Sequence, residues 1–192
     1  MKFSTQLFDS PNLKLDFYDP EKDAAEEASF TYDMNYAWAM DIDKAPHPLT
    51  TFEVKKKREE QLKRADENKA EYYFAIRRKE DDKFLGVVAI PWISWRNRNA
   101  GMRVLIGDAD LRKTYLDEAL HMALRYVFEE LEIYSLDSFT GEFQQDVMDA
   151  CNKAGMVECV RQREMVYRAG QLWDRVIMSI HQDEWLQLHN EE

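Results

Sequence analysis

The fold of this chain is decided by residues 101–131, which read GMRVLIGDADLRKTYLDEALHMALRYVFEEL. The stretch begins with a short apolar segment, Met102–Ile106, that is typical of a buried strand. A polar loop, Gly107–Lys113, follows it. An amphipathic helix is then predicted over Tyr115–Leu131, because apolar residues recur there at steps of three and four. The stretch therefore predicts a strand that leads through a loop into a long helix.

The start of this helix is predicted from its capping residues. The Thr114 hydroxyl can accept a backbone N–H, and Asp117 three residues later completes a capping box. The first turn of a helix has unpaired N–H groups and a positive dipole end, and Arg112 and Lys113 add charge beside it. The pattern predicts an anion site. The alternative is that these residues only cap and charge a helix that binds no ligand.

Strands and helices alternate through the rest of the chain. Apolar alternation and turn residues predict six further strands, at Leu13–Tyr18, Glu71–Arg78, Phe84–Trp95, Ile133–Thr140, Met156–Tyr167 and Leu172–His181. Helices are expected at Glu21–Phe30, from Thr50 to about Lys69, and at Gln145–Lys153. Aromatic and methionine residues at every second position of Phe30–Met40 favour an extended segment, with a loop or irregular helix as alternatives. The order predicts one α+β domain over residues 1–192, with a mixed sheet and helices on its faces.

Composition excludes several classes of protein. The formal net charge is −11, which argues against nucleic-acid binding because that requires a basic surface. An acidic surface is compatible with a cationic substrate, although it more often only confers solubility. No apolar run approaches 18 residues, so no membrane span is predicted. The two cysteines form no CxxC pair, which favours a reduced cytoplasmic setting, and the four histidines are scattered, so no metal site is expected.

Several local motifs, in this order and spacing, resemble the GNAT N-acetyltransferase superfamily. The likeness is to the branch of ribosomal-protein N-terminal and polyamine acetyltransferases. The motifs are SWRNRNAG at 94–101, IGD at 106–108, KTYLDEA at 113–119, ACNKAGM at 150–156, REMVYRAG at 163–170, and Asp174, Met178, Glu184 and Trp185 near the end. The resemblance implies a mixed, mostly antiparallel central sheet of about seven strands, with helices on both faces.

The resemblance also implies acetyl-coenzyme A as co-substrate and direct attack by a primary amine of a peptide N-terminus, a polyamine or a small molecule. The pantetheine arm would pair with the backbone of the central strand, and the diphosphate would lie on the N-terminus of the main helix. The cofactor-binding residues that follow are Val104, Leu105, Ile106, Arg112, Lys113, Thr114, Tyr115, Leu116, Gln144 and Lys153. Because the branch often forms dimers, a homodimer is a further expectation.

The chain departs from the family pattern at three positions. Thr114 and Leu116 stand where the family has glycines close to phosphate, and their side chains add bulk there. Cys151 stands where the family has the tyrosine that protonates the leaving thiolate. A thiol of ordinary pKa, about 8.5, can in principle do this, but a free cysteine is more often part of the core.

Glu142 is the candidate general base, with Asp108 as a second candidate, and either can equally be a surface carboxylate. Tyr32, Tyr36 and Trp38 are expected to line the acceptor side, although aromatic residues are more often core. The function predicted is acetyl transfer to an amine. The alternative is a GNAT-fold protein without catalysis that binds coenzyme A or another protein.

Overall fold

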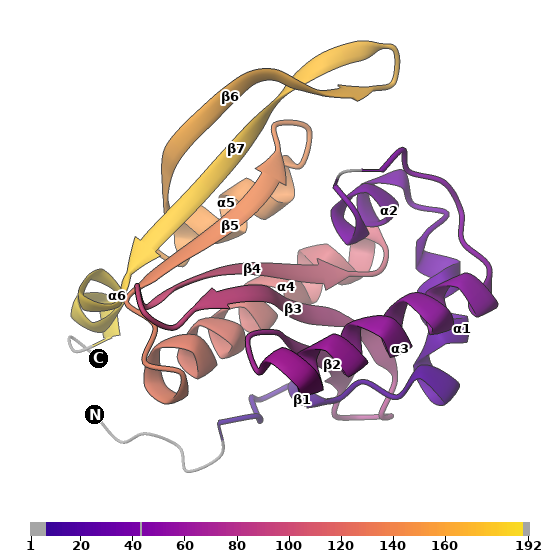
Figure 1. Ribbon diagram of the computed structural model, residues 1–192, viewed down its shortest axis with the longest axis horizontal. Coiled ribbons are helices and arrows are strands. Elements are labelled where there is room, and N and C mark those ends of the chain that lie inside the picture. The colour runs from indigo at the N-terminus through magenta and orange to yellow at the C-terminus, as the bar shows by residue number, and fades with distance from the viewer. Residues whose placement is uncertain (1–6, 43, 190–192) are drawn as a thin grey trace.

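A computed structural model describes residues 7–42 and 44–189 and shows a seven-stranded sheet in the order β1-β2-β3-β4-β5-β7-β6 (Figure 1). The strands are β1 (Leu13–Phe17), β2 (Tyr72–Arg78), β3 (Phe84–Ser94), β4 (Asn99–Ile106), β5 (Ser135–Gly141), β6 (Val157–Arg168) and β7 (Gln171–His181). Neighbouring strands run antiparallel except β4 and β5, which are parallel. The predicted mixed, mostly antiparallel sheet is confirmed.

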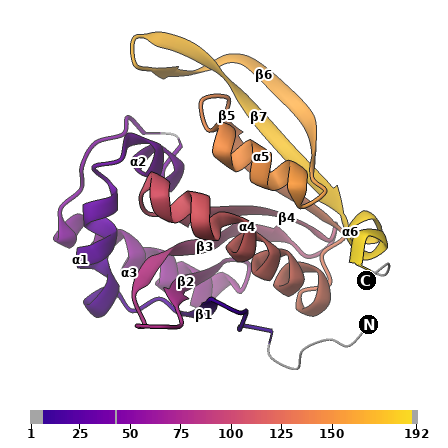
Figure 2. The same ribbon diagram turned by 180° about the vertical axis from the view of Figure 1, so that it is seen from behind.

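The helices cover both faces of the sheet. They are α1 (Pro20–Phe30), α2 (Met34–Met40), α3 (Thr51–Asn68), α4 (Ala109–Arg125) with a π-helical turn η1 (Tyr126–Glu130), α5 (Gln145–Lys153) and α6 (Gln182–His189). Helices α1, α2 and α3 pack on one face around an apolar cluster that includes Val54, Val87 and Leu105. Helices α4 and α5 pack on the other face (Figure 2), around a larger cluster that includes Leu120, Leu136 and Met148.

Several predicted boundaries are confirmed to within a few residues. The capping box of α3 forms, with the Thr50 hydroxyl accepting from the Glu53 backbone at 3.3 Å. Pro91 lies where the β3–β4 register shifts between Ala89 and Trp92, as expected of a residue that cannot donate to the ladder. Helix α6 was not predicted. Its apolar anchor is Trp185, which is buried beside Phe128 with ring centroids 5.4 Å apart.

The extended segment predicted over Phe30–Met40 is wrong. Helix α1 continues to Phe30, and the Asp33 side chain caps a second helix by accepting from the Asn35 backbone at 2.8 Å. Phe30, Tyr36, Trp38 and Met40 are buried by contacts on more than one side of the helices, whereas Tyr32 is exposed, so the period of two does not indicate a strand.

One buried ionic network joins the three helices of this face. Glu27 of α1 accepts from Arg58 of α3 at 2.9 Å, and also from the hydroxyls of Tyr18 at 2.7 Å and Tyr36 at 2.9 Å. Burial raises the pKa of Glu27, but Arg58 and the two hydroxyls outweigh it and hold that pKa below its ordinary value. The carboxylate therefore stays charged inside the protein and fixes α2, which carries Tyr36, against α1 and α3.

No helix in the described ranges is long and apolar enough to cross a membrane.

Candidate functional site

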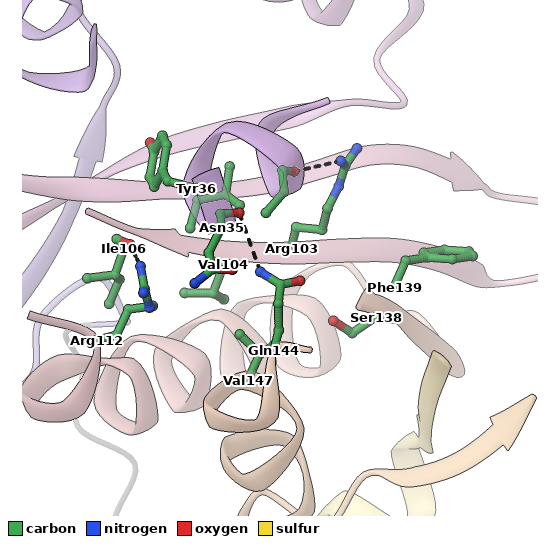
Figure 3. A pocket seen from close by; sticks show the side chains of 12 residues that line it. Asn35, Tyr36, Arg103, Val104, Ile106, Arg112, Ser138, Phe139, Gln144 and Val147 are labelled. Carbon is green, nitrogen blue, oxygen red and sulfur yellow. Dashed lines mark hydrogen bonds between the residues drawn. The ribbon is translucent and has the colours of Figure 1, made fainter. Parts of the chain in front are cut away.

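The candidate site lies where β4 and β5 separate. These strands pair only from Asn99 to Met102 and from Ser135 to Ser138. Beyond these pairs the strands diverge, and α2 lies over the opening (Figure 3). The cleft between them is lined by Asn35, Tyr36, Ala39, Arg103, Val104, Leu105, Ile106, Arg112, Ser138, Phe139, Gln144 and Val147. It holds a cavity of about 30 Å³, which has room for no more than a few water molecules.

The edge of β4 beyond Met102 is open to an extended ligand. Val104, Leu105 and Ile106 pair with β3 on one side and have no partner strand on the other. An unpaired strand edge presents backbone N–H and C=O groups to a peptide-like chain, as in strand addition. The structure therefore brings these three predicted residues to the cleft, beside an open strand edge.

Helix α4 begins at Ala109 rather than at Tyr115, so the predicted helix start at Thr114 is wrong. Asp108 is the N-cap, and its side chain accepts from the Leu111 backbone at 2.9 Å. Aspartate is among the best capping residues, and 109–113 contain good helix formers, so the helix forms one and a half turns earlier. The Thr114 hydroxyl instead donates to the Asp110 carbonyl at 3.0 Å, inside the helix.

The other residues predicted at that helix start therefore lie along the body of α4. Leu116 is buried in the core cluster of the α4 face, and Tyr115 packs beside it. Lys113 is exposed and lies 3.9 Å from Asp110. Their expected role in holding a diphosphate stays a prediction, with the N–H groups of the first turn now placed at 109–111.

Arg112 is the predicted residue that does reach the cleft. Its guanidinium is buried and forms ion pairs with Asp33 of α2 and Asp146 of α5, both at 2.8 Å. It also donates to the Gly107 carbonyl at 3.1 Å. Burial lowers its pKa, but the two carboxylates outweigh burial and raise the pKa above its ordinary value. Arg112 is thus a permanent cation that ties α2 and α5 to the start of α4.

Three further contacts hold α2 over the cleft. The Arg103 guanidinium donates to the Ala39 carbonyl at 2.9 Å, and the Gln144 amide donates to the Asn35 carbonyl at 3.5 Å (Figure 3). From the hairpin, Arg168 donates to the Asn35 side chain at 2.5 Å. Of these residues only Gln144 was predicted. Arg103 was detectable as a lone charge within the apolar strand segment 102–106.

Cys151 lies behind the cleft rather than in it. The thiol is buried in the core, and burial raises its pKa to about 12, only partly offset by a hydrogen bond with Ser138. A thiol of ordinary pKa is a stronger acid than this group, so Cys151 is a poor proton donor to a departing thiolate. Ser138 does line the cleft, at the last paired position of β5. It was not predicted, since a serine in a strand carries no sequence signal of its own.

The two candidate bases lie outside the cleft. Glu142 is half-exposed and pairs with Arg161 at 3.2 Å, and Asp108 is occupied as the α4 cap. No carboxylate is among the described residues that line the cleft. Lys153 is also remote from it, paired with Asp117 at 2.9 Å on the exposed side of α4 and α5.

The residues predicted to line the acceptor side, Tyr32, Tyr36 and Trp38, lie in different places because α2 is a helix rather than a strand. Tyr36 faces the cleft, with its hydroxyl bonded to Glu27, whereas Trp38 is buried against Phe143 with ring centroids 5.1 Å apart. Trp38 lines a different hollow of about 660 Å³ between α2 and the β6–β7 hairpin. Tyr32 precedes the helix and is 74% exposed, outside all these cavities. The structure therefore does not bring the three together.

Comparison with known proteins places this geometry in context. The acetyltransferase (GNAT) domain family matches residues 14–157. The search of curated protein sequences found no match. Among solved structures, the chain is similar to a spermidine N-acetyltransferase from Vibrio cholerae in complex with CoA and spermine. The TM-score is 0.74 at 18% identity, covering 92% of this chain and 99% of that chain.

A second similar structure is a candidate ribosomal-protein-serine acetyltransferase, also from Vibrio cholerae. Its TM-score is 0.70 at 18% identity, covering 91% of this chain and 96% of that chain. At such identities the likeness shows a shared fold.

Proposed function

Because the chain belongs to the GNAT acetyltransferase family, we propose that it transfers an acetyl group from acetyl-coenzyme A to a primary amine. The observation that carries this proposal is the parting of β4 and β5 after Met102 and Ser138, which leaves one edge of β4 unpaired beside a cleft. A family member that had lost its co-substrate would have no use for this open edge, since closing it would pair more backbone groups.

The co-substrate fits the cleft residues by chemistry. The free edge of Val104–Ile106 would hold the amides of the pantetheine arm, and the N–H groups at 109–111 with Arg112 would hold the diphosphate. The cavity of about 30 Å³ is far too small for the arm, so α2 must move away from β4 when the co-substrate binds. The contacts to be released are those of Arg103, Gln144 and Arg112 with α2.

The reaction that follows is a direct acyl transfer. The neutral amine nitrogen attacks the thioester carbonyl carbon, the carbon–sulfur bond breaks, the nitrogen loses a proton and the sulfur gains one. Catalysis of this kind is mainly positioning of the two reactants. The cleft contributes a β4 backbone that fixes the thioester and a Ser138 hydroxyl at the point where the strands part.

We propose that Ser138, with the predicted Cys151 behind it, stabilises the departing thiolate. Ser138 lines the cleft and is hydrogen-bonded to Cys151, so its hydroxyl can donate a hydrogen bond to the departing thiolate. The sulfur then takes its proton from water, and water takes up the proton that the nitrogen loses. Glu142 stays a candidate base that can act only through intervening water, because it does not line the cleft.

The test is release of free coenzyme A, measured with a thiol reagent, in the presence of acetyl-coenzyme A and a panel of primary amines. Amine-dependent release with the acetylated product seen by mass spectrometry is expected. Acetyl-coenzyme A should also raise the melting temperature, because a ligand that binds only the folded state stabilises it.

A second function is favoured by one observation, the engagement of Arg112 by two carboxylates over a nearly filled cleft. If this arrangement never opens, the protein is an inactive GNAT-fold binding module. No stabilisation by coenzyme A and no turnover of any amine would select this alternative, and turnover would exclude it.

The finer features of the proposal are a cytoplasmic setting and a homodimer. Two free cysteines, Cys151 and Cys159, support a reducing compartment. Exposed apolar side chains on the edge strand β6, at Val157, Val160 and Met165, support an interface with a second copy. Light scattering of the purified protein tests the dimer.

A further inference from the structure

A hollow between α2, α3 and the sheet is positively charged, although the chain as a whole carries −11. Its volume is about 540 Å³. The charged side chains that line it are the cations Lys44, Lys56, Lys57, Arg64 and Arg103 and the carboxylates Asp41, Glu53 and Glu60. Cations therefore outnumber carboxylates here, against the balance of the whole molecule.

Internal pairing leaves the positive charge in excess. Asp41 is shared between two lysines, at 2.8 Å from Lys57 and 3.1 Å from Lys44. Glu53 is engaged with Thr50 in the α3 capping box. Lys56 makes no hydrogen bond or ion pair with any described residue. Arg64 is paired with Glu71 at 3.4 Å, and the lining carboxylate Glu60 forms no ion pair with a described residue. The excess positive charge of the hollow therefore rests on Lys56 and on the two lysines that share Asp41.

The hollow leads to the point where β4 and β5 part. A smaller cavity of about 230 Å³, lined by Asp41, Pro91, Met102, Arg103 and Phe139 among others, lies next to it. Arg103 lines the large hollow, this cavity and the cleft, and Asp41 and Pro91 line both of the first two. Met102 is the last β4 residue paired with β5. An amine placed in the small cavity thus reaches the thioester position with the rest of its molecule in the cationic hollow.

A second hollow, on the other side of residues 44–46, is also positively charged. The hollow between α2 and the β6–β7 hairpin is lined by Lys44, Arg168 and Arg175, with no carboxylate among its described lining residues. The two arginines are held by neutral amides, Arg168 by Asn35 at 2.5 Å and Arg175 by Gln162 at 2.6 Å. Neither arginine forms an ion pair with a described residue, although the charge of Asp33 acts on Arg168.

We infer that the acceptor of this enzyme is a primary amine whose remaining part is anionic, such as the N-terminus of an acidic peptide. The inference rests on the proposed acetyl transfer and names its substrate class. A polyamine would place positive charges against Lys44, Lys56 and Lys57, which is unfavourable. Carboxylates in the same positions gain favourable contacts with these side chains, and the preference weakens as salt rises.

The test compares three acceptors in the coenzyme A release assay. They are a tetrapeptide with N-terminal serine followed by glutamates, the same peptide with lysines in their place, and spermine. Free glutamate, a small amine with two carboxylates, is a further arm that separates a peptide from an amino acid. The variant is the double substitution Lys44→Gln and Lys56→Glu, at two lysines that line the hollow. The matched control is Lys63→Glu, on the same helix but outside the hollow, with a side chain 77% exposed.

We expect the glutamate peptide to be the best acceptor, with a KM about tenfold lower than that of the lysine peptide at low salt. The double variant should raise its KM about tenfold, and the control should not. A lower KM for spermine or for the lysine peptide overturns the inference while acetyl transfer stands.

A binding measurement separates the two proposals when no acceptor turns over. Calorimetry of the glutamate peptide with the chain alone should then show binding that the double variant removes, in which case the anion site stands and acetyl transfer fails. If the glutamate peptide is neither acetylated nor bound, both the anion site and the acetyl transfer are overturned.

Discussion

Releasing Arg112 from Asp33 should strengthen acetyl-coenzyme A binding. The substitution Asp33→Asn removes the charge that pairs with Arg112 at 2.8 Å, and asparagine still caps α2. The wild-type pair is partly buried, with Asp33 26% exposed, so we take its coupling as about 1 kcal/mol. If the diphosphate must take Arg112 from Asp33, the variant should bind about fivefold more tightly by calorimetry.

The same substitution should lower the stability of the free protein. Loss of about 1 kcal/mol corresponds to a fall of about 2–4 °C in melting temperature for a chain of this size. The control is Asp149→Asn, an exposed carboxylate of α5 that bonds only with Gln145. A lower melting temperature with unchanged or weaker acetyl-coenzyme A binding would refute the reasoning, since Arg112 would then hold α2 without serving the co-substrate.

Three other predictions concern buried groups. Glu27→Gln should lower the free energy of unfolding by about 3–5 kcal/mol, because it leaves Arg58 buried without a charged partner. The pKa of Glu27 is lowered on folding, so its contribution to folding stability is present above pH about 4.5 and is lost as pH falls through the folded-state pKa. Acid unfolding of the wild type and of the Glu27→Gln variant measures this difference. Native protein should react with maleimide at the exposed Cys159 only; Cys151, with a pKa of about 12, should react after unfolding, and two reactive thiols at pH 8 would contradict this. Ser138→Ala should lower kcat about tenfold with little change in KM, and an unchanged kcat would remove Ser138 from the mechanism.

Most of the fold could be predicted because short local sequence signals mark where its helices, strands and turns begin and end. The Thr50 capping box, Pro91 in β3 and the polar turns of the sheet each act over a few residues, and all three appear where they were expected. Helix α2 could not be read in this way. Its residues are buried by α1 and α3 on one side and by β4 on another, so their spacing follows tertiary contacts rather than a single apolar stripe.

The candidate site was predicted less completely than the fold. Val104, Leu105 and Ile106 were found because a central apolar strand is visible in the sequence, and they do line the cleft. The helix start was misplaced because two capping signals compete, and Asp108 forms the cap rather than Thr114. Residues that come together only through folding, such as Ser138 and Asn35, lie on different elements far apart in the sequence.

Helix α2 presents a different side to each of three hollows. Asn35 and Ala39 face the cleft, Met34 and Trp38 face the hairpin, and residues 37, 40 and 41 face the cationic side. Because the helix is only seven residues long, any displacement of it would be felt on all three sides. A molecule that shifts it from any one side therefore alters affinity at the other two, and thermodynamic reciprocity makes that influence equal in both directions. Binding of either reactant would then change the affinity for the other by the same factor, through the seven residues Met34–Met40.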